Sequence, residues 1–196
     1  EHYEEIGFLD SNGRASQCVI MDPAELALMA KRGARVSHQP ISNSHDGCGI
    51  APVPDMLRLG IPVGLGTDGE NNDFLEVMRT AISIHRAKRI NPKAISAQDV
   101  FFMATENGAK ALGYEEIGTL ETGKQADYIT IEPDLATPLN QENIIDQVVR
   151  FCHAGDITST TVAGNLVMRN GEILGLDEKQ AKKDCREVTA EYWRSV

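Results

Sequence analysis

Short apolar runs alternate with amphipathic segments along the first half of the chain. After a short helix over 2–9, each apolar run predicts a strand and each amphipathic segment predicts a helix; in chain order these segments are 15–21, 22–33, 34–37, 54–59, 61–66 and 74–88. Strands that alternate with helices favour parallel β/α units over an all-β sandwich. A parallel sheet of three such strands would leave both edges open, so we expect this half to need further strands.

The pattern changes after one more helix, which is predicted over 96–113. Beyond it the sequence predicts a small β-rich module, because turn residues are frequent and residues 128–131 alternate as a strand does. The runs 159–168 and 172–174 predict a hairpin around the intervening Arg-Asn-Gly. A charged amphipathic helix over 177–193 follows the hairpin.

Composition and charge exclude several classes of function. The formal net charge is −10, with no basic stripe to neutralise nucleic acid or an anionic membrane surface. No apolar stretch approaches the length of a membrane-spanning helix, and the first residues of this sequence do not show the basic-then-apolar pattern of a signal sequence. The four cysteines are widely spaced without a C-x-x-C pair, which favours free thiols in a reducing, cytoplasmic location. Because the sequence opens on glutamate, we expect a processed product or a piece of a longer chain.

One carboxylate stands out at the end of a predicted strand. In the run 63–69, glycines surround Asp68 just where an α/β sheet collects its ligands, at the carboxyl ends of its strands. An Asp between Thr and Gly is equally natural as a turn residue or a helix N-cap, so both interpretations stay open. The polar, glycine-rich segment 38–49 predicts a long functional loop, whose adjacent His45 and Asp46 fit a solvated surface better than a second metal site.

Several motifs in order carry a resemblance to a known family. They are Val36–Asn43, Gly49–Pro54, Gly64–Gly69, Ala104–Gly113, Gly118–Asp127 and Val162–Asn165. With these the chain resembles the amidohydrolase superfamily, in its chlorohydrolase and aminohydrolase branch of methylthioadenosine/adenosylhomocysteine deaminases, guanine deaminases and triazine hydrolases. The resemblance implies an α/β fold made of the C-terminal part of a (β/α)8 barrel, part of a small β-sandwich and a C-terminal helix. The implied parts are 1–113, 114–176 and 177–196.

The resemblance also implies a metal-dependent hydrolase. In this family one divalent metal, zinc most often and iron as the alternative, is bound by histidines and by an Asp that ends the eighth strand, the position of Asp68. That residue would serve as metal ligand and as catalytic proton shuttle, while metal-bound hydroxide attacks a ring carbon of a purine, nucleoside, pterin or s-triazine. Deamination or dechlorination would follow. The other metal ligands would lie outside this chain, in an N-terminal half of the barrel, and a homo-oligomer is expected.

Gln17 departs from the family pattern, which usually places a His there. Glutamine can donate a hydrogen bond to a developing oxyanion but cannot carry a proton, so an altered substrate, a structural role and lost activity all stay open. This residue and the absent ligands motivate an alternative, a non-catalytic amidohydrolase-like chain or fragment that serves in assembly. We keep Gln17 as a second catalytic candidate beside Asp68.

Three further residues are candidates for substrate binding. His38 would face the barrel mouth or be held by the loop backbone, and the two alternatives are even. Ser42 and Asn43 match a Ser-Asn pair near the family's mouth, yet both are also natural loop caps. His85 is expected on the surface or in packing, and Asp73 with its neighbouring asparagines is expected to line the loop after Asp68.

Overall fold

The structure is a computed structural model that describes residues 2–69 and 71–195. It divides into two compact units. Unit 1 takes in the chain up to Lys124 together with Asp134–Ala154, and unit 2 consists of Gln125–Pro133 and the chain from Gly155 onward. The part boundaries expected at residues 113 and 176 stay predictions.

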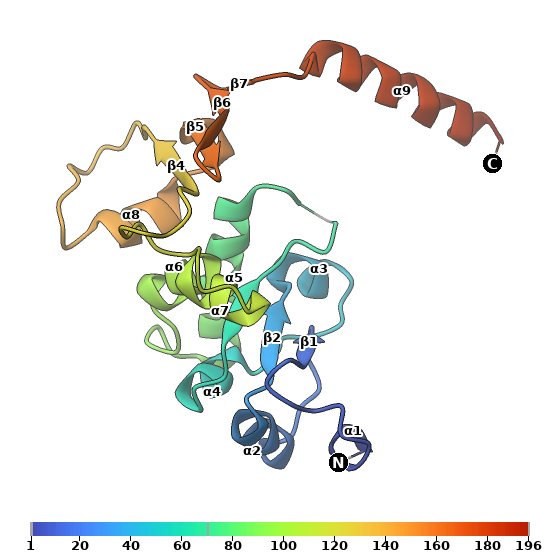
Figure 1. The fold of residues 1–196 in the computed structure, drawn as a ribbon, viewed down its shortest axis with the longest axis vertical. Helices are drawn as coiled ribbons and strands as arrows, with labels where there is room; N and C mark the ends of the chain where they lie inside the picture. Colours follow the sequence, from blue (N-terminus) through green and yellow to red (C-terminus); the bar gives the residue numbers. More distant parts are fainter. Residues whose placement is uncertain (1, 70, 196) are drawn as a thin grey trace. The chain divides into compact units, whose positions relative to one another are not determined.

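Unit 1 is built on a parallel sheet of three strands in the order β1-β2-β3, with bounds β1 (Arg14–Ser16), β2 (Arg35–His38) and β3 (Val63–Leu65) (Figure 1). Ala15 pairs with Val36, and Val36 in turn pairs with Val63. The predicted parallel β/α units are therefore present. The first strand is shorter than expected, because Gln17 and Cys18 take left-handed φ values of 69° and 50° and so leave the ladder.

Helices surround this sheet, with bounds α1 (His2–Glu5), α2 (Pro23–Arg32), α3 (Pro40–His45), α4 (Val53–Arg58), α5 (Phe74–Arg89), α6 (Ala97–Ala104), α7 (Glu106–Leu112) and α8 (Ile144–Phe151). The start and stop of α2 follow the expected rules. Asp22 and Glu25 form a capping box, and Gly33 ends the helix with φ 70°. Asp73 is the N-cap of α5, and its carboxylate accepts hydrogen bonds from the N–H groups of Leu75 and Glu76.

Two predicted elements are wrong in detail. The segment 96–113 is not one helix, because Thr105 takes φ −126° and ψ −100° and separates α6 from α7. The break lets α7 approach β3 closely: a Cβ added to Gly64 would lie 3.1 Å from the Cα of Gly108. The segment 38–49 is not all loop, because Pro40 starts the six-residue helix α3 within it.

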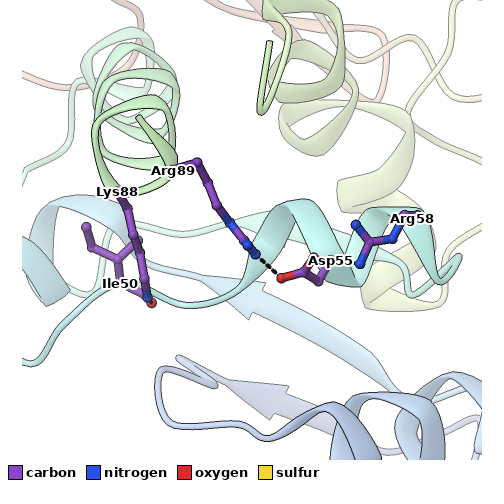
Figure 2. Close-up of polar contacts among 5 residues, drawn as sticks. All are labelled: Ile50, Asp55, Arg58, Lys88 and Arg89. Atoms are coloured by element: carbon purple, nitrogen blue, oxygen red, sulfur yellow. Dashed lines mark hydrogen bonds and ion pairs between the residues drawn. The ribbon is translucent and has the colours of Figure 1, made fainter. Parts of the chain in front are cut away.

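The core of unit 1 lies between the sheet and its helices. Its fully buried apolar side chains include Val36, Val53, Met56, Val63, Val77, Val100 and Met103, each with at most 1% of its surface exposed. Polar contacts hold the end of α5 to α4. Figure 2 shows Arg89 reaching Asp55, which also accepts from Arg58 at 2.7 Å, and Lys88 donating to the carbonyl of Ile50.

α8 was not expected, since its segment was assigned to the β-rich module. It belongs to unit 1, where it packs against α5 and α6 and buries Val149 completely. Arg79 on α5 closes its C-terminal end by donating from Nη1 to the carbonyls of Arg150 at 3.2 Å and Cys152 at 3.0 Å. The eight-residue helix is amphipathic, and a single apolar face explains why it packs against helices.

Unit 2 contains an antiparallel sheet of four strands in the order β4-β5-β6-β7. The bounds are β4 (Tyr128–Ile131), β5 (Ile157–Val162), β6 (Asn165–Arg169) and β7 (Glu172–Ile173), with η1 (Ala154–Asp156) before β5 and α9 (Glu178–Ser195) after β7. The strand at 128–131 and the turn after Arg169 are confirmed. The run 159–168 is two strands and not one, because Ala163 and Gly164 turn the chain with φ values of 48° and 78°.

Among the residues that the structure describes, no helix combines the length and the apolar character needed to cross a membrane.

Candidate functional site

Asp68 lies just beyond the carboxyl end of β3, and its side chain is exposed. Its φ of 54° is left-handed, and Gly69 continues with φ 82°, so the chain turns sharply after the strand. The strand end itself is held by β2, because the N–H of Gly66 donates to the carbonyl of His38 at 2.9 Å. The turn therefore presents the carboxylate at the edge of the sheet where sequence reasoning expected it.

Two donors from other elements hold the carboxylate of Asp68. Gln17 donates from Nε2 to Oδ2 at 2.7 Å, and Ser42 donates from Oγ to the same oxygen at 2.8 Å. The hydrogen bond from Ser42, followed by that from Gln17, lowers the pKa of Asp68 below its usual value. The group is thus an anion at neutral pH, and Oδ1 carries neither of these bonds.

Gln17 is fixed in a single orientation by this contact. A carboxylate only accepts hydrogen bonds, so the amide nitrogen of Gln17 must face Asp68 and the oxygen must face away. The backbone N–H of Gln17 donates to the carbonyl of Ser37 at 2.9 Å and to Oε1 of Gln39 at 3.2 Å. Oε1 of Gln17 is buried without a hydrogen-bond partner among the described residues, although most buried polar atoms have one.

Ser42 and Asn43 lie together on α3, with 3% and 2% of their surfaces exposed. Ser42 reaches Asp68, and its 3.5 Å separation from Oδ2 of Asp46 is too long to compete for the one hydroxyl proton. Nδ2 of Asn43 is buried and has no partner within the part of the chain that the structure describes. The structure thus joins Gln17, Ser42 and Asp68 directly, with Asn43 buried next to Ser42.

His38 turns away from this group and faces α5. Its Nε2 lies 3.1 Å from Nε2 of His85, and the two rings have 0% and 1% of their surfaces exposed. Burial lowers the pKa of His38 to about 3, with His85 as a second cause. Burial also lowers the pKa of His85 to about 4, with help from the charges of Lys88 and Arg89. This placement favours packing over substrate contact for His38, whose predicted binding role stays untested.

Three residues around the site were missed or only partly placed by sequence reasoning. Of the two alternatives for His85, surface or packing, the structure shows packing. The helical spacing from Leu75 through Met78 and Ile82 places this residue on the buried face of α5. Gln39 carried no signal, because nothing in the sequence shows which side chain fills the gap between strand ends. Asp73 ends the loop after Asp68, and its carboxylate caps α5 and accepts from the N–H of Ala154 at 3.0 Å, a role that was not expected.

The donor set suits one ligand position of a divalent metal. Asp68 is an exposed, ionised carboxylate with an oxygen that takes part in neither of its two hydrogen bonds, which is what a metal ligand requires. Within residues 2–69 and 71–195, no group of three or more His, Cys, Asp or Glu side chains is placed to hold a metal. A metal bound by Asp68 would therefore need further ligands beyond those that the described residues group around it.

Comparison with known proteins places the chain in a family. The amidohydrolase family model matches residues 1–167, and the chain belongs to that family. A 5'-deoxyadenosine deaminase of Methanopyrus kandleri is 34% identical, and the match covers 100% of this chain and 46% of that protein. A 5-methylthioadenosine/S-adenosylhomocysteine deaminase of Acetivibrio thermocellus is 36% identical, with 96% of this chain and 45% of that protein covered.

A solved structure agrees with these relatives. An adenosine deaminase from Xanthomonas campestris with bound zinc has a TM-score of 0.92 and 26% identity, over 100% of this chain and 45% of that chain. The expected resemblance and the expected fold class, a partial amidohydrolase barrel with a sheet and a C-terminal helix, are confirmed. The chain spans less than half the length of these relatives.

Proposed function

We propose that this chain is part of a metal-dependent hydrolase that deaminates an amino-substituted nitrogen heterocycle, with an adenine nucleoside as the first substrate to test. One observation carries the proposal: an ionised carboxylate, Asp68, is presented at a strand end by donors from two other elements. The names of the relatives support the substrate class, since two are deaminases of adenosine derivatives and a structural neighbour is an adenosine deaminase with bound zinc.

In the proposed reaction, water replaces the exocyclic amino group, and the products are the oxo compound and ammonia. A divalent metal, with zinc as the first choice, supplies a water molecule whose pKa is lowered towards neutrality. Asp68 would bind this metal and would hold a proton at Oδ1 before passing it to the leaving amine. Gln17 and Ser42 would keep Oδ2 occupied, so that the carboxylate cannot rotate away from the reacting atoms.

Asn43 is the candidate for substrate contact that the geometry supports most. Its Nδ2 is buried with no hydrogen-bond partner among the described residues, and it follows Ser42 on α3. A ring nitrogen of the heterocycle is an acceptor of suitable chemistry for such a donor. His38, in contrast, is buried against His85, so any effect of this residue on substrate binding would be indirect.

The test is a purified protein expressed from its complete coding sequence. Ammonia release would be measured with 5'-deoxyadenosine, 5'-methylthioadenosine and guanine, and chloride release with a chloro-s-triazine. Each assay would be run before and after chelation, together with metal content per chain. We expect turnover of an adenine nucleoside that is lost on chelation and restored by zinc. No turnover of any of the four by a folded, metal-loaded protein would favour the alternative of a non-catalytic chain that serves in assembly.

The remaining expectations, a homo-oligomer and a cytoplasmic location, rest on the sequence alone and stay predictions. Molar mass in solution and subcellular fractionation would test them.

A further inference from the structure

Gln39 occupies the space between the ends of the strands, and only 6% of its surface is exposed. Its Oε1 accepts from the backbone N–H of Gln17 at 3.2 Å, and its Nε2 donates to Oγ of Ser37 at 2.7 Å. Its own carbonyl accepts from the N–H of Asn43 at 3.1 Å in the first turn of α3. One buried residue therefore contacts the residue after β1, a residue of β2 and the start of α3.

The same side chain also packs against the segment that leads to Asp68. A Cβ added to Gly66 would lie 3.0 Å from Nε2 of Gln39 and 3.1 Å from Oγ of Ser37. Contacts this short are rare for real Cβ atoms, so a side chain at Gly66 would displace the carboxamide. Since the φ of Gly66 lies outside the left-handed region, space and not backbone conformation accounts for the glycine here.

The turn that Gln39 contacts is a strained one. Gln17 and Cys18 have φ values of 69° and 50°, which side-chain-bearing residues adopt at an energetic cost. Such strain persists only where surrounding contacts fix the backbone. The N–H of Gln17 is held by two acceptors, the carbonyl of Ser37 and Oε1 of Gln39. The backbone conformation of this turn determines the direction of the Gln17 side chain, whose Nε2 donates to Asp68.

We propose that Gln39 is a positioning residue of the site: its carboxamide holds the strained turn at Gln17 and thereby holds the carboxylate of Asp68 in one orientation. The catalytic consequence rests on the proposed function, whereas the structural consequence does not. A glutamine that only filled space could be replaced by an apolar side chain of similar volume without effect on the turn. The two alternatives therefore differ in what happens at Gln17 and Cys18.

Cys18 offers a direct reporter of the turn, because this free thiol is half-buried and lies next to Gln17. In the complete protein with the exposed Cys48 and Cys185 changed to serine, alkylation of Cys18 would be followed by peptide mass spectrometry. We expect Gln39→Met, which removes both side-chain hydrogen bonds, and Gly66→Ala, which displaces the carboxamide, to speed alkylation by about tenfold or more through local opening. Gln39→Glu keeps an acceptor for the N–H of Gln17 and should alter the rate less than Gln39→Met.

The matched control is Gly64→Ala, the same substitution two residues earlier. Its added Cβ would meet Gly108 and Ala111 of α7 and not Gln39, so it perturbs packing without touching the turn. We expect its alkylation rate to stay within about twofold of the parent, provided that the opening is local. Equal acceleration by Gly64→Ala and Gly66→Ala would mean general loosening and would overturn the proposal, as would unchanged alkylation in both Gln39→Met and Gly66→Ala.

Steady-state kinetics provide the second readout, once the parent turns over a nucleoside. Misplacing the carboxylate should lower kcat by about 10- to 100-fold while KM changes by less than about threefold. A change confined to KM would contradict a role through Asp68. If the parent has no activity, the proposed function fails, but the alkylation rates still decide the role of Gln39, so the two failures are distinguishable.

Discussion

His38 and His85 face each other through their Nε2 atoms at 3.1 Å, and neither ring exposes more than 1% of its surface. One ring must donate and the other accept, so the pair is formed by two neutral imidazoles in different tautomers. The contact joins the last residue of β2 to α5, the helix that follows Asp68 in the chain. A buried polar pair of this kind ties a strand end to the helical layer.

The first prediction concerns stability against pH. Both folded pKa values, about 3 for His38 and about 4 for His85, lie below the value of about 6.5 for an unfolded histidine. Between these pH values the unfolded chain therefore binds more protons than the folded chain. The contribution of the neutral histidine pair to stability is complete above pH 6.5 and is lost as the pH falls towards 4. We expect the free energy of unfolding to drop by about 1.4 kcal/mol per pH unit for each histidine, as measured by urea unfolding between pH 7 and pH 4.5.

The double variant His38→Leu with His85→Leu is the control for this slope, because it removes both titrating groups and leaves no polar atom unpaired. Its unfolding free energy should fall less steeply with acid than that of the parent. The single variant His85→Leu leaves the Nε2 of His38 buried and unpaired, which should cost about 1–3 kcal/mol at neutral pH. Equal slopes of unfolding free energy against pH in the parent and the double variant, between pH 7 and pH 4.5, would contradict the prediction.

The second prediction concerns the carboxylate itself. Asp68→Asn retains a residue that tolerates the left-handed backbone but removes the negative charge that would bind metal. We expect deaminase activity to fall by roughly 10³-fold or more, together with a loss of bound metal, while the unfolding transition stays cooperative. Asp134→Asn, at an exposed carboxylate in another part of unit 1, should change neither quantity. A fully active, metal-loaded Asp68→Asn protein would remove Asp68 from the proposed mechanism.

The third prediction concerns the two donors to Oδ2 of Asp68. Gln17→Leu and Ser42→Ala each remove one hydrogen bond, and each should lower kcat by about tenfold. Because both bonds end on the same oxygen, the double variant should deviate from the product of the single effects, which a double-mutant cycle measures. Gln17→Glu should be worse than Gln17→Leu, since it places a second carboxylate against Asp68. Independent effects in the cycle would indicate that the two residues act on different steps.

The fourth prediction concerns α8, whose end is closed by Arg79. Arg79→Met keeps the aliphatic part of the side chain but removes the donor to the carbonyls of Arg150 and Cys152. We expect faster hydrogen exchange of the amides in the last turn of α8, by about tenfold, with α5 unchanged. Arg150→Met is the matched control, because that side chain forms an exposed pair with Asp146 and lies over the ring of Phe151, whereas its carbonyl is retained. Equal exchange in the two variants would show that Arg79 does not hold the helix end.

The elements predicted from sequence were those with local signals. Asp22 and Gly33 bound α2 as expected, and the alternation of strands and helices gave the parallel sheet. The break at Thr105 and the turn at Ala163 have no such signal, since threonine and alanine continue helices and strands as readily as they end them. Here tertiary contacts decide, as the close approach of α7 to β3 shows.

In the candidate site, likewise, the residues with a local sequence signal were predicted and the contacts between elements were not. Asp68 follows an apolar run that ends on glycines, and the motif around Ser42 was visible from its order along the chain. The hydrogen bonds that join Gln17 and Ser42 to Asp68 cross between separate elements, and no local pattern reports them. For His38 the sequence left two alternatives even, the barrel mouth and the loop backbone. The alternation of side chains along β2 buries it on the same side as Val36, where it contacts His85 of α5.

Gly64 and Gly108 meet where β3 lies against α7, and no side chain separates the two backbones. A contact without side chains has no rotamers that could absorb an error, so a displacement of the helix passes directly to the strand. The strand ends three residues before Asp68. The position of β3, and with it the start of the turn that carries Asp68, therefore depends in part on two residues that contribute no chemistry of their own.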